Sequence, residues 1–420
     1  MRIVIDLQGA QNNSRNRGIG RYSLSLTKAI ARVSTDSHEI IILLNGAFSD
    51  SIYDVYNELE GLVPKDNIKI FNGLRKTEGI NPVNNWRRMA SEYIYEHYIR
   101  LLCPDFLLVT SLIEGFEDET IGSIGKCSTE FQTAVMLYDL IPLIYPGNYL
   151  QHPRVSFWYY NRLDELRRAN LLLSISESSR NEAINYLGFP VNDVVNISAA
   201  TDDRFKVISY SNTERTNVLS RYGISKPFVL YVGASDQRKN IEGLIVAYGS
   251  LSKTVLASYQ LVIAWDFSAP SRKQLTDLAL KNRMSSNDLI FTGYVPDRDL
   301  VTLYNICSLF VFPSFHEGFG LPALEAMSCG APTIASRATS LPEVVGWDAA
   351  LFDPNDTQDI SRLIEKSLTD NVFRAGLIEN ALLQSKKFSW DKSAEMALNT
   401  MEAAYIIERD KVAVGNIPCL

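Results

Sequence analysis

Short apolar runs alternate with longer amphipathic stretches along the chain. In the first half, the apolar runs predict strands at residues 2–7, 39–44, 68–71, 106–110, 133–137, 171–175 and 194–198. In the second half, they predict strands at residues 228–232, 260–264, 289–292, 309–312, 333–336 and 351–352. Strands that are apolar on both faces are typical of parallel sheets covered by helices. The pattern therefore predicts an α/β protein with two doubly wound, Rossmann-like domains that face a cleft.

The breaks in this pattern place the domain boundaries. We predict an N-terminal domain at 1–200, a polar linker at 201–226, a second domain at 227–389 and a long amphipathic helix within 390–420. A further helix is predicted from Asn84 to Leu102, where Trp86 and several tyrosines alternate with arginines. A partly buried helix explains this composition, and a helix that contacts a membrane surface is the alternative.

Composition narrows the classes of function. The length of 420 residues fits two domains, and the net charge of −7 argues against general nucleic-acid binding. Five cysteines, an odd number without metal-ligand spacing, are interpreted as free thiols in a reducing compartment. No apolar run approaches the roughly 20 residues that span a bilayer. We expect a cytoplasmic protein, with attachment to the inner face of the cytoplasmic membrane left open.

The stretch from Phe310 to Ala335 carries the clearest chemistry. It reads as a buried strand, a loop from Glu317 to Gly320, and a helix with Pro322 near its start and Gly330 after its end. The backbone amides of Gly318, Phe319, Gly320 and Leu321 precede the first helical hydrogen bonds and favour an anion such as phosphate. Glu317 and Glu325 are suited to accept hydrogen bonds from sugar hydroxyl groups. Together these features predict a nucleotide-sugar site.

Three other strand ends carry candidate residues. Gly233 opens a turn in which Arg238 and Lys239 would meet a diphosphate, although a solvated surface pair is the simpler explanation of two adjacent cations. Gly20 lies in a glycine loop after the first strand, where either a tight turn or close approach to a phosphate explains the glycine. Asp139 follows another strand, where α/β sheets place ligands.

These motifs together resemble a known family. Glu317 and Glu325 enclose seven residues, as in the E-x7-E motif of glycosyltransferase family four, which are retaining enzymes of the GT-B fold. The segments 233–240, 291–295 and 340–346 also resemble that family in sequence and order. The segment 139–142, together with 340–346, is most similar to bacterial mannosyltransferases that build polysaccharides such as O-antigens.

The resemblance implies a role for each candidate residue. Glu325 would hold the ribose, Glu317 the transferred sugar, and Tyr294 and Val295 would lie near the nucleobase. The diphosphate would be bound by Arg238, Lys239, the turn at Gly233, the amides of 318–321 and, from the first domain, the loop at Gly20. The final helix, from residue 390, would cross back to pack on the first domain. Two positions depart from the family pattern: Tyr138 replaces a histidine, and Ala234 replaces an arginine.

The resemblance also implies a mechanism and partners. We expect retaining transfer without a metal or cofactor, since the sequence has no suitably placed Asp-x-Asp pair and Arg238 and Lys239 can stabilise the leaving diphosphate. Asp139 is the candidate for orienting or deprotonating the acceptor. GDP-mannose is the favoured donor and a UDP-sugar the alternative. The expected acceptor is a glycan or lipid-linked glycan.

A protein of another class is the rival interpretation. It would be a catalytically silent module that binds nucleotide-sugar or glycan within a larger polymerase. The ending at residues 418–420 leaves further domains or partner enzymes of a polysaccharide assembly complex open.

Overall fold

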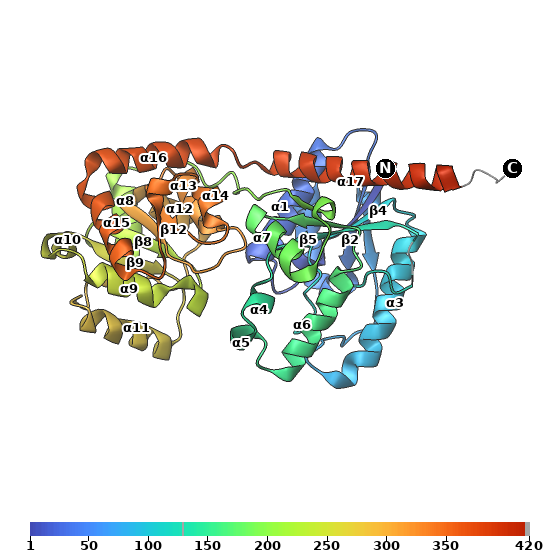
Figure 1. The fold of residues 1–420 in the computed structure, drawn as a ribbon, viewed down its shortest axis with the longest axis horizontal. Helices are drawn as coiled ribbons and strands as arrows, with labels where there is room; N and C mark the ends of the chain where they lie inside the picture. The colour runs from blue at the N-terminus through green and yellow to red at the C-terminus, as the bar shows by residue number, and fades with distance from the viewer. Residues whose placement is uncertain (128–129, 416–420) are drawn as a thin grey trace. The chain divides into compact units, whose positions relative to one another are not determined.

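The computed structural model describes residues 1–127 and 130–415, which divide into two compact units. The first unit contains Met1–Ala199 and the last helix from Trp390, and the second contains Ala200–Ser389. Figure 1 shows a sheet flanked by helices in each unit. The expectation of two doubly wound α/β domains is confirmed.

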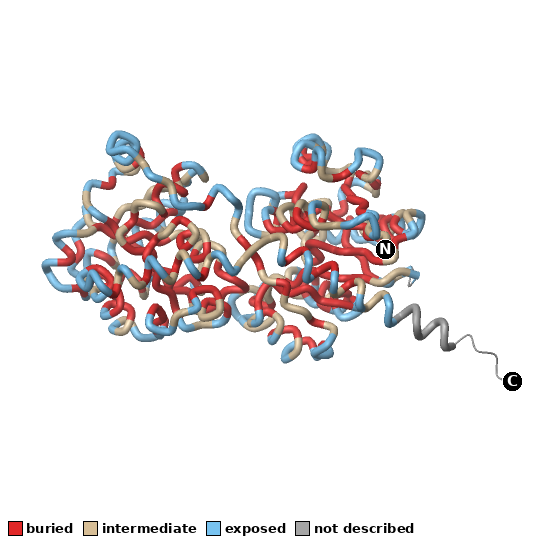
Figure 2. The backbone as a smooth tube through the Cα atoms, turned by 90° about the horizontal axis from the view of Figure 1, so that it is seen from above, coloured by how far each residue is buried: buried red, intermediate tan, exposed pale blue. Residues whose placement is uncertain are grey.

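A seven-stranded parallel sheet forms the centre of the first unit, in the order β3-β2-β1-β4-β5-β6-β7. Its strands are β1 (Arg2–Asp6), β2 (Glu39–Asn45), β3 (Ile68–Phe71), β4 (Phe106–Val109), β5 (Gln132–Leu137), β6 (Leu171–Ser174) and β7 (Val194–Asn196). In the register, Ile3 of β1 lies opposite Ile40 on one side and Phe106 on the other. Apart from the edge strands β3 and β7, these strands are buried along most of their length, because helices cover both faces of the sheet. Figure 2 shows buried backbone through the interior of each unit.

The helices of the first unit are α1 (Gly18–Val33), α2 (Ser49–Leu59), α3 (Asn85–Leu101), α4 (Ile141–Ile144), α5 (Pro146–Tyr149), α6 (Pro153–Leu166), α7 (Glu177–Glu182) and α17 (Trp390–Gly415). The prediction that the last helix packs on the first domain is confirmed. Arg32 Nε of α1 donates to Asp391 Oδ1 at 3.0 Å, and the Tyr22 and Trp390 rings meet edge to face at 4.8 Å.

Helix α1 begins earlier than the sequence suggested. Gly18 and Gly20, predicted to lie in a loop, form its first turn. A Cβ atom on Gly20 would lie 2.4 Å from the Ser14 carbonyl oxygen and equally close to the Cα of Arg15. The amide of Gly20 also donates to that carbonyl at 3.2 Å. Glycine is therefore required here because the preceding loop packs directly on the helix.

A six-stranded parallel sheet forms the second unit, in the order β10-β9-β8-β11-β12-β13. Its strands are β8 (Phe228–Val232), β9 (Gln260–Ala264), β10 (Leu289–Phe291), β11 (Leu309–Phe312), β12 (Thr333–Ser336) and β13 (Leu351–Phe352). Its helices are α8 (Asn212–Arg221), α9 (Ile241–Gly249), α10 (Lys253–Ser258), α11 (Ala269–Lys281), α12 (Asp297–Ile306), α13 (Leu321–Ser328), α14 (Leu341–Val345), α15 (Thr357–Thr369) and α16 (Asn371–Ser385).

The segment predicted as a linker, 201–226, lies within the second unit and contains α8. This helix has a capping box, in which Ser211 and Glu214 satisfy each other's backbone amides. Tyr222, just after it, donates its hydroxyl to Asp299 of α12 at 2.7 Å. The polar composition of the segment thus reflects a helix on the surface of the second unit rather than a free connection.

A buried carboxylate marks the end of β1 in the first unit. Asp6 is 3% exposed and accepts the Tyr95 hydroxyl at 2.6 Å and the Gln8 side-chain amide at about 3 Å. Burial raises the pKa of Asp6 to about 6, against the opposing effect of these hydrogen bonds. The folded protein therefore binds the proton of Asp6 more tightly than the unfolded chain does.

This carboxylate should make stability depend on pH. Because the pKa of Asp6 is higher in the folded state, the free energy of unfolding should fall as pH rises from about 4 to about 7, by on the order of 2–3 kcal/mol. The variant Asp6→Asn should lack this part of the pH dependence. Denaturant unfolding of the full chain at pH 4 and 7 measures it, with the exposed Asp54→Asn as control. The same pH dependence in all three proteins would contradict the assignment.

Candidate active site

The carboxyl ends of β8 and β11 lie side by side in the second unit. The sheet order reverses there, since β8 leads outward to β9 while β11 leads to β12. Open α/β sheets place ligands outside such a switch point. The loops after the two strands are joined: the Phe315 amide donates to the Arg238 carbonyl at 2.7 Å, and the Asn240 side chain donates to the Pro313 carbonyl at 3.2 Å. The predicted donor-site residues thus come from two neighbouring loops.

Arg238, Lys239 and Glu317 form one buried ion cluster at this point. Lys239 Nζ donates to Glu317 Oε1 at 2.6 Å, and Arg238 Nη1 donates to Oε2 at 2.9 Å. Arg238 Nη1 also donates to the His316 carbonyl at 2.8 Å. Glu317 is 6% and Lys239 8% exposed. Burial alone would raise the pKa of Glu317, but the charges of Lys239 and Arg238 hold it below the usual value for a carboxyl group.

The cluster brings together residues that were predicted to have separate roles. The two cations were predicted to bind diphosphate and Glu317 to bind sugar, yet in the structure the carboxylate is bound by both cations. Asp236 adds a second carboxylate, which accepts the Arg238 amide at 3.0 Å and lies 3.7 Å from its Nε. An ammonium has three N–H donors and a guanidinium five, so each cation can bind more than one acceptor at a time. Glu317 contacts both cations and therefore keeps them oriented.

The loop from Glu317 to Leu321 is fixed by residues that precede α14. The Thr339 hydroxyl accepts the Glu317 amide at 3.0 Å, and the Ser340 hydroxyl donates to the Glu317 and Phe319 carbonyls at 3.0 and 2.8 Å. Gly320 has a φ of 106°, and a Cβ atom there would lie 2.5 Å from the Leu341 side chain. Only glycine fits this position without strain. Helix α13 begins directly after it, so the amides of 318–321 lie at its N-terminal end, as predicted.

Glu325 lies inside α13 and is partly buried. Its Oε2 accepts the hydroxyl of Tyr304, from α12, at 3.0 Å. Burial and the neighbouring charge of Glu325 raise the pKa of Tyr304 well above its usual value, so the tyrosine remains the donor. The contact fixes the orientation of the carboxylate that was predicted to hold ribose.

Three further predicted donor-site residues, Tyr294, Val295 and Gly233, also follow strands of the second unit, whereas Gly20 belongs to α1 of the first unit. Tyr294, 76% exposed, and the partly buried Val295 follow β10, after a turn in which Gly293 has a φ of 71°. An exposed tyrosine ring offers a face for a planar base. Gly233 follows β8, where a Cβ atom would lie 2.6 Å from the buried hydroxyl of Tyr231. Glycine there lets the turn pass close over the tyrosine.

Tyr138 and Asp139 lie at the end of β5 in the first unit. The Tyr138 hydroxyl donates to the Thr110 carbonyl at 3.0 Å and lies 3.1 Å from the Ser23 hydroxyl. Burial raises the pKa of Tyr138 well above its usual value. The side chain that replaces the family's histidine is therefore a neutral group that ties β4 to α1. Asp139 accepts the Ile141 amide at 3.0 Å.

A cavity of about 200 Å³ opens beside these two residues. It is lined mostly by apolar side chains, and Glu114 from the loop after β4 brings a second carboxylate to it besides Asp139. Glu114 accepts the Ser14 hydroxyl at 3.0 Å. Burial raises the pKa of Glu114 above the usual value, which suits it to accept a proton near neutral pH. The cavity lies at the carboxyl ends of β4 and β5, next to the switch point between β1 and β4.

Comparisons with known proteins identify the family. Residues 220–384 match the family model described as glycosyl transferases group 1. The O-antigen chain mannosyltransferase B of Escherichia coli is 32% identical over 391 residues, which are 91% of this chain and 95% of that protein. The chain belongs to the group 1 glycosyltransferases.

Another relative of this group 1 glycosyltransferase is the serotype-specific mannosyltransferase WbdA of Escherichia coli. It is 40% identical over 399 residues, which are 95% of this chain but 47% of WbdA. The chain thus spans about half the length of the WbdA proteins that it matches.

Solved structures share the fold at low sequence identity. The Anabaena protein HepE, solved with UDP and glucose, has a TM-score of 0.67 at 17% identity and covers 96% of this chain and 100% of its own. The lipopolysaccharide glycosyltransferase WaaG has a TM-score of 0.64 at 14% identity, with 95% and 99% covered. These matches confirm the predicted GT-B fold.

Four residues had no role in the sequence analysis: Asp236, Tyr304 and Thr339 contact the predicted residues of the second unit, and Glu114 lines the cavity of the first unit. Thr339 directly precedes the family-like segment 340–346, and this position could have indicated it. Glu114 and Tyr304 carry no such indication, because their places depend on which strands and helices become neighbours. In the described part of the chain, no helix is long and apolar enough to cross a membrane and no group of three potential ligands could hold a metal ion.

Proposed function

We propose that this chain transfers mannose from GDP-mannose to a growing glycan, with retention of the anomeric configuration. The observation that carries the proposal is 40% identity to a serotype-specific mannosyltransferase over 95% of the chain. The O-antigen chain mannosyltransferase B supports the same sugar. In this proposal the acceptor is a lipid-linked polysaccharide at the inner face of the cytoplasmic membrane.

We assign donor binding to the second unit. Arg238 and Lys239 would stabilise the charge that develops on the diphosphate as its bond to the sugar breaks, together with the amides at the start of α13. Glu317, already held by both cations, would keep them in place and accept a hydroxyl of the sugar. This charge stabilisation needs no metal ion, and none is part of the proposal.

We assign acceptor binding to the cavity of the first unit. The acceptor hydroxyl forms the new bond to the anomeric carbon and must lose its proton. Asp139 and Glu114 line the cavity and are the carboxylates placed to orient this hydroxyl or take the proton. Tyr138 contributes structure rather than proton transfer, because its hydroxyl is bound within the fold and its pKa is raised.

A panel of nucleotide-sugars tests the donor. At a concentration a hundredfold above its dissociation constant, GDP-mannose should stabilise the full chain by about 2.7 kcal/mol, measured as a rise in melting temperature. UDP-glucose and UDP-N-acetylglucosamine should have little effect. A larger shift with a UDP-sugar would overturn the donor assignment.

A hydrolysis assay tests whether the chain is an enzyme. Incubation with the stabilising donor should slowly release free sugar and nucleoside diphosphate. When a glycan acceptor is added, the sugar should be transferred to the glycan instead of being released. Binding without release or transfer would instead support the silent binding module.

A further inference from the structure

Helix α3 buries both of its acidic residues and exposes several of its large apolar residues. Its sequence contains two acidic residues, Glu92 and Glu96, and each is only 1% exposed. Trp86, Met89 and Tyr93, spaced three and four residues apart on the exposed side of the helix, are 59%, 48% and 51% exposed. Surface helices normally show the reverse arrangement. Both the burial of the two acids and the exposure of the large apolar side chains need an explanation.

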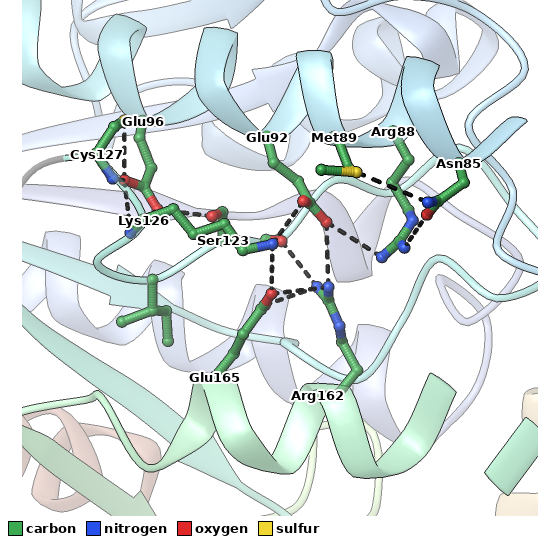
Figure 3. A network of polar contacts seen from close by, with 12 residues as sticks. Asn85, Arg88, Met89, Glu92, Glu96, Ser123, Lys126, Cys127, Arg162 and Glu165 are labelled. Carbon is green, nitrogen blue, oxygen red and sulfur yellow. Dashed lines mark hydrogen bonds and ion pairs between the residues drawn. The ribbon is translucent and has the colours of Figure 1, made fainter. Parts of the chain in front are cut away.

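On the inner face, the buried acids are fully engaged by cations and donors (Figure 3). Glu92 accepts from Lys126 at 2.6 Å, Arg162 at 3.1 Å and Arg88 at 3.3 Å. Arg162, from α6, is 1% exposed and also contacts Glu165 at 2.9 Å. Such a network joins α3 to α6 without stabilising the fold more than apolar packing would. Its other consequence is that α3 turns no carboxylate toward solvent.

Glu96 is bound by a separate set of donors. The Ser123 hydroxyl donates to it at 2.6 Å, and the backbone amides of Lys126 and Cys127 donate at 2.9 and 2.7 Å. Figure 3 shows this carboxylate turned toward the loop that carries these donors. Both acids of α3 are therefore fixed inward by specific contacts.

The aromatic exposure continues onto neighbouring residues. Figure 1 shows α3 and α6 beginning at the same end of the first unit. There Arg154, in the first turn of α6, donates to the Ile80 carbonyl at 3.4 Å. Ile80, Val83 and Phe157 are 44%, 76% and 71% exposed. We call Ile80, Val83, Trp86, Met89 and Phe157 the apolar end of the first unit.

Two arginines, Arg87 and Arg154, lie beside residues of the apolar end. The Arg87 guanidinium lies 4.8 Å from the centre of the Trp86 ring, and Arg154 is exposed. The acids nearby belong to other segments: Glu78 accepts the side-chain amide of Asn84 at 3.0 Å, and Glu117 is exposed in the loop after β4. Aromatic and aliphatic side chains next to arginines suit the boundary between acyl chains and anionic headgroups.

We propose that the apolar end of the first unit docks on an anionic lipid surface. The apolar side chains enter the boundary between headgroups and acyl chains, and Arg87 and Arg154 contact lipid phosphates. A protein partner would also bury aromatic residues. The outer face of α3 carries no carboxylate, so anionic lipid headgroups can approach it without electrostatic repulsion. This favours a lipid surface over a protein partner.

Vesicle sedimentation of the full chain tests this. Vesicles of equal parts phosphatidylcholine and phosphatidylglycerol should bind the chain more strongly than phosphatidylcholine alone, and added salt should weaken binding. Trp86→Ser and Phe157→Ser should each lower the partition coefficient about tenfold, since each removes a large apolar side chain from the lipid. The control is Tyr53→Ser, on α2 of the same unit, where the side chain is 73% exposed and binding should not change.

Three results would overturn the proposal: no binding to anionic vesicles, equal losses in the Tyr53 control, or full binding by the Trp86→Ser, Phe157→Ser double variant. Gel filtration separates the main rival, because a dimer that dissociates in the double variant would make this end a protein interface. The outcome is independent of the proposed function, since vesicle binding requires no donor. The double variant should retain wild-type transfer to a water-soluble acceptor.

Discussion

Lys239→Ala is expected to lower the rate of sugar transfer about a hundredfold or more. Lys239 is 8% exposed and its ammonium group lies 2.6 Å from Glu317, so its charge acts where solvent screens it little. Removing one such preorganised donor to a developing anion costs ~3 kcal/mol of barrier. Initial rates with GDP-mannose and a glycan acceptor measure the effect. Rates within a few-fold of wild type would remove Lys239 from the site.

Matched variants separate loss of charge from loss of fold. Lys253→Ala removes an exposed lysine of the same unit, at the start of α10, and should leave transfer unchanged. Glu317→Ala should also nearly abolish transfer, but it leaves Lys239 buried without its carboxylate and should lower the melting temperature. Glu317→Gln retains a hydrogen-bond acceptor, so its melting temperature should stay close to that of the wild type. Its transfer rate should fall further from the wild-type value. A wild-type rate for both Glu317 variants would contradict the role of this residue.

The strands could be predicted from sequence because their physical cause is local. A strand inside a parallel sheet is apolar on both faces, so β8 and β11 appear as uninterrupted apolar runs and their predicted bounds agree with the structure. The start of α1 was missed because Gly18 and Gly20 are poor helix formers by themselves. Their place in the helix depends on how the loop at Ser14 packs against Gly20, and the hydrophobic pattern does not show this contact.

The sequence indicated individual residues of the candidate site but not which of their side chains contact one another. Arg238 and Glu317 are 79 residues apart, and nothing local indicates that their side chains form a pair. They meet because β8 and β11 are neighbours in the sheet, which is a property of strand order. Glu114 was missed for the same reason, since its carboxylate reaches the cavity only through the adjacency of β1, β4 and β5. The ion cluster changes the interpretation of Glu317 from a sugar ligand alone to the residue that orients both cations.

Glu325→Ala is expected to weaken binding of a nucleoside diphosphate about tenfold to a hundredfold. A hydrogen bond to a charged group contributes roughly 1.5–3 kcal/mol, and the proposal gives this carboxylate the ribose hydroxyls. Asp139→Ala should change nucleotide affinity little, because Asp139 belongs to the cavity assigned to the acceptor. Titration calorimetry with GDP measures both. Equal or greater loss in Asp139→Ala would reverse the assignment of donor and acceptor residues.

Tyr304→Phe provides the control that isolates the carboxylate from its support. It removes only the hydroxyl that donates to Glu325 at 3.0 Å and leaves the buried ring in place. If Tyr304 serves to orient Glu325, affinity should fall less than in Glu325→Ala, and the double variant should bind no more weakly than Glu325→Ala alone. Additive losses would mean that Tyr304 acts on the nucleotide by a separate route, and Glu325 would then lose its place as the oriented ligand of the ribose.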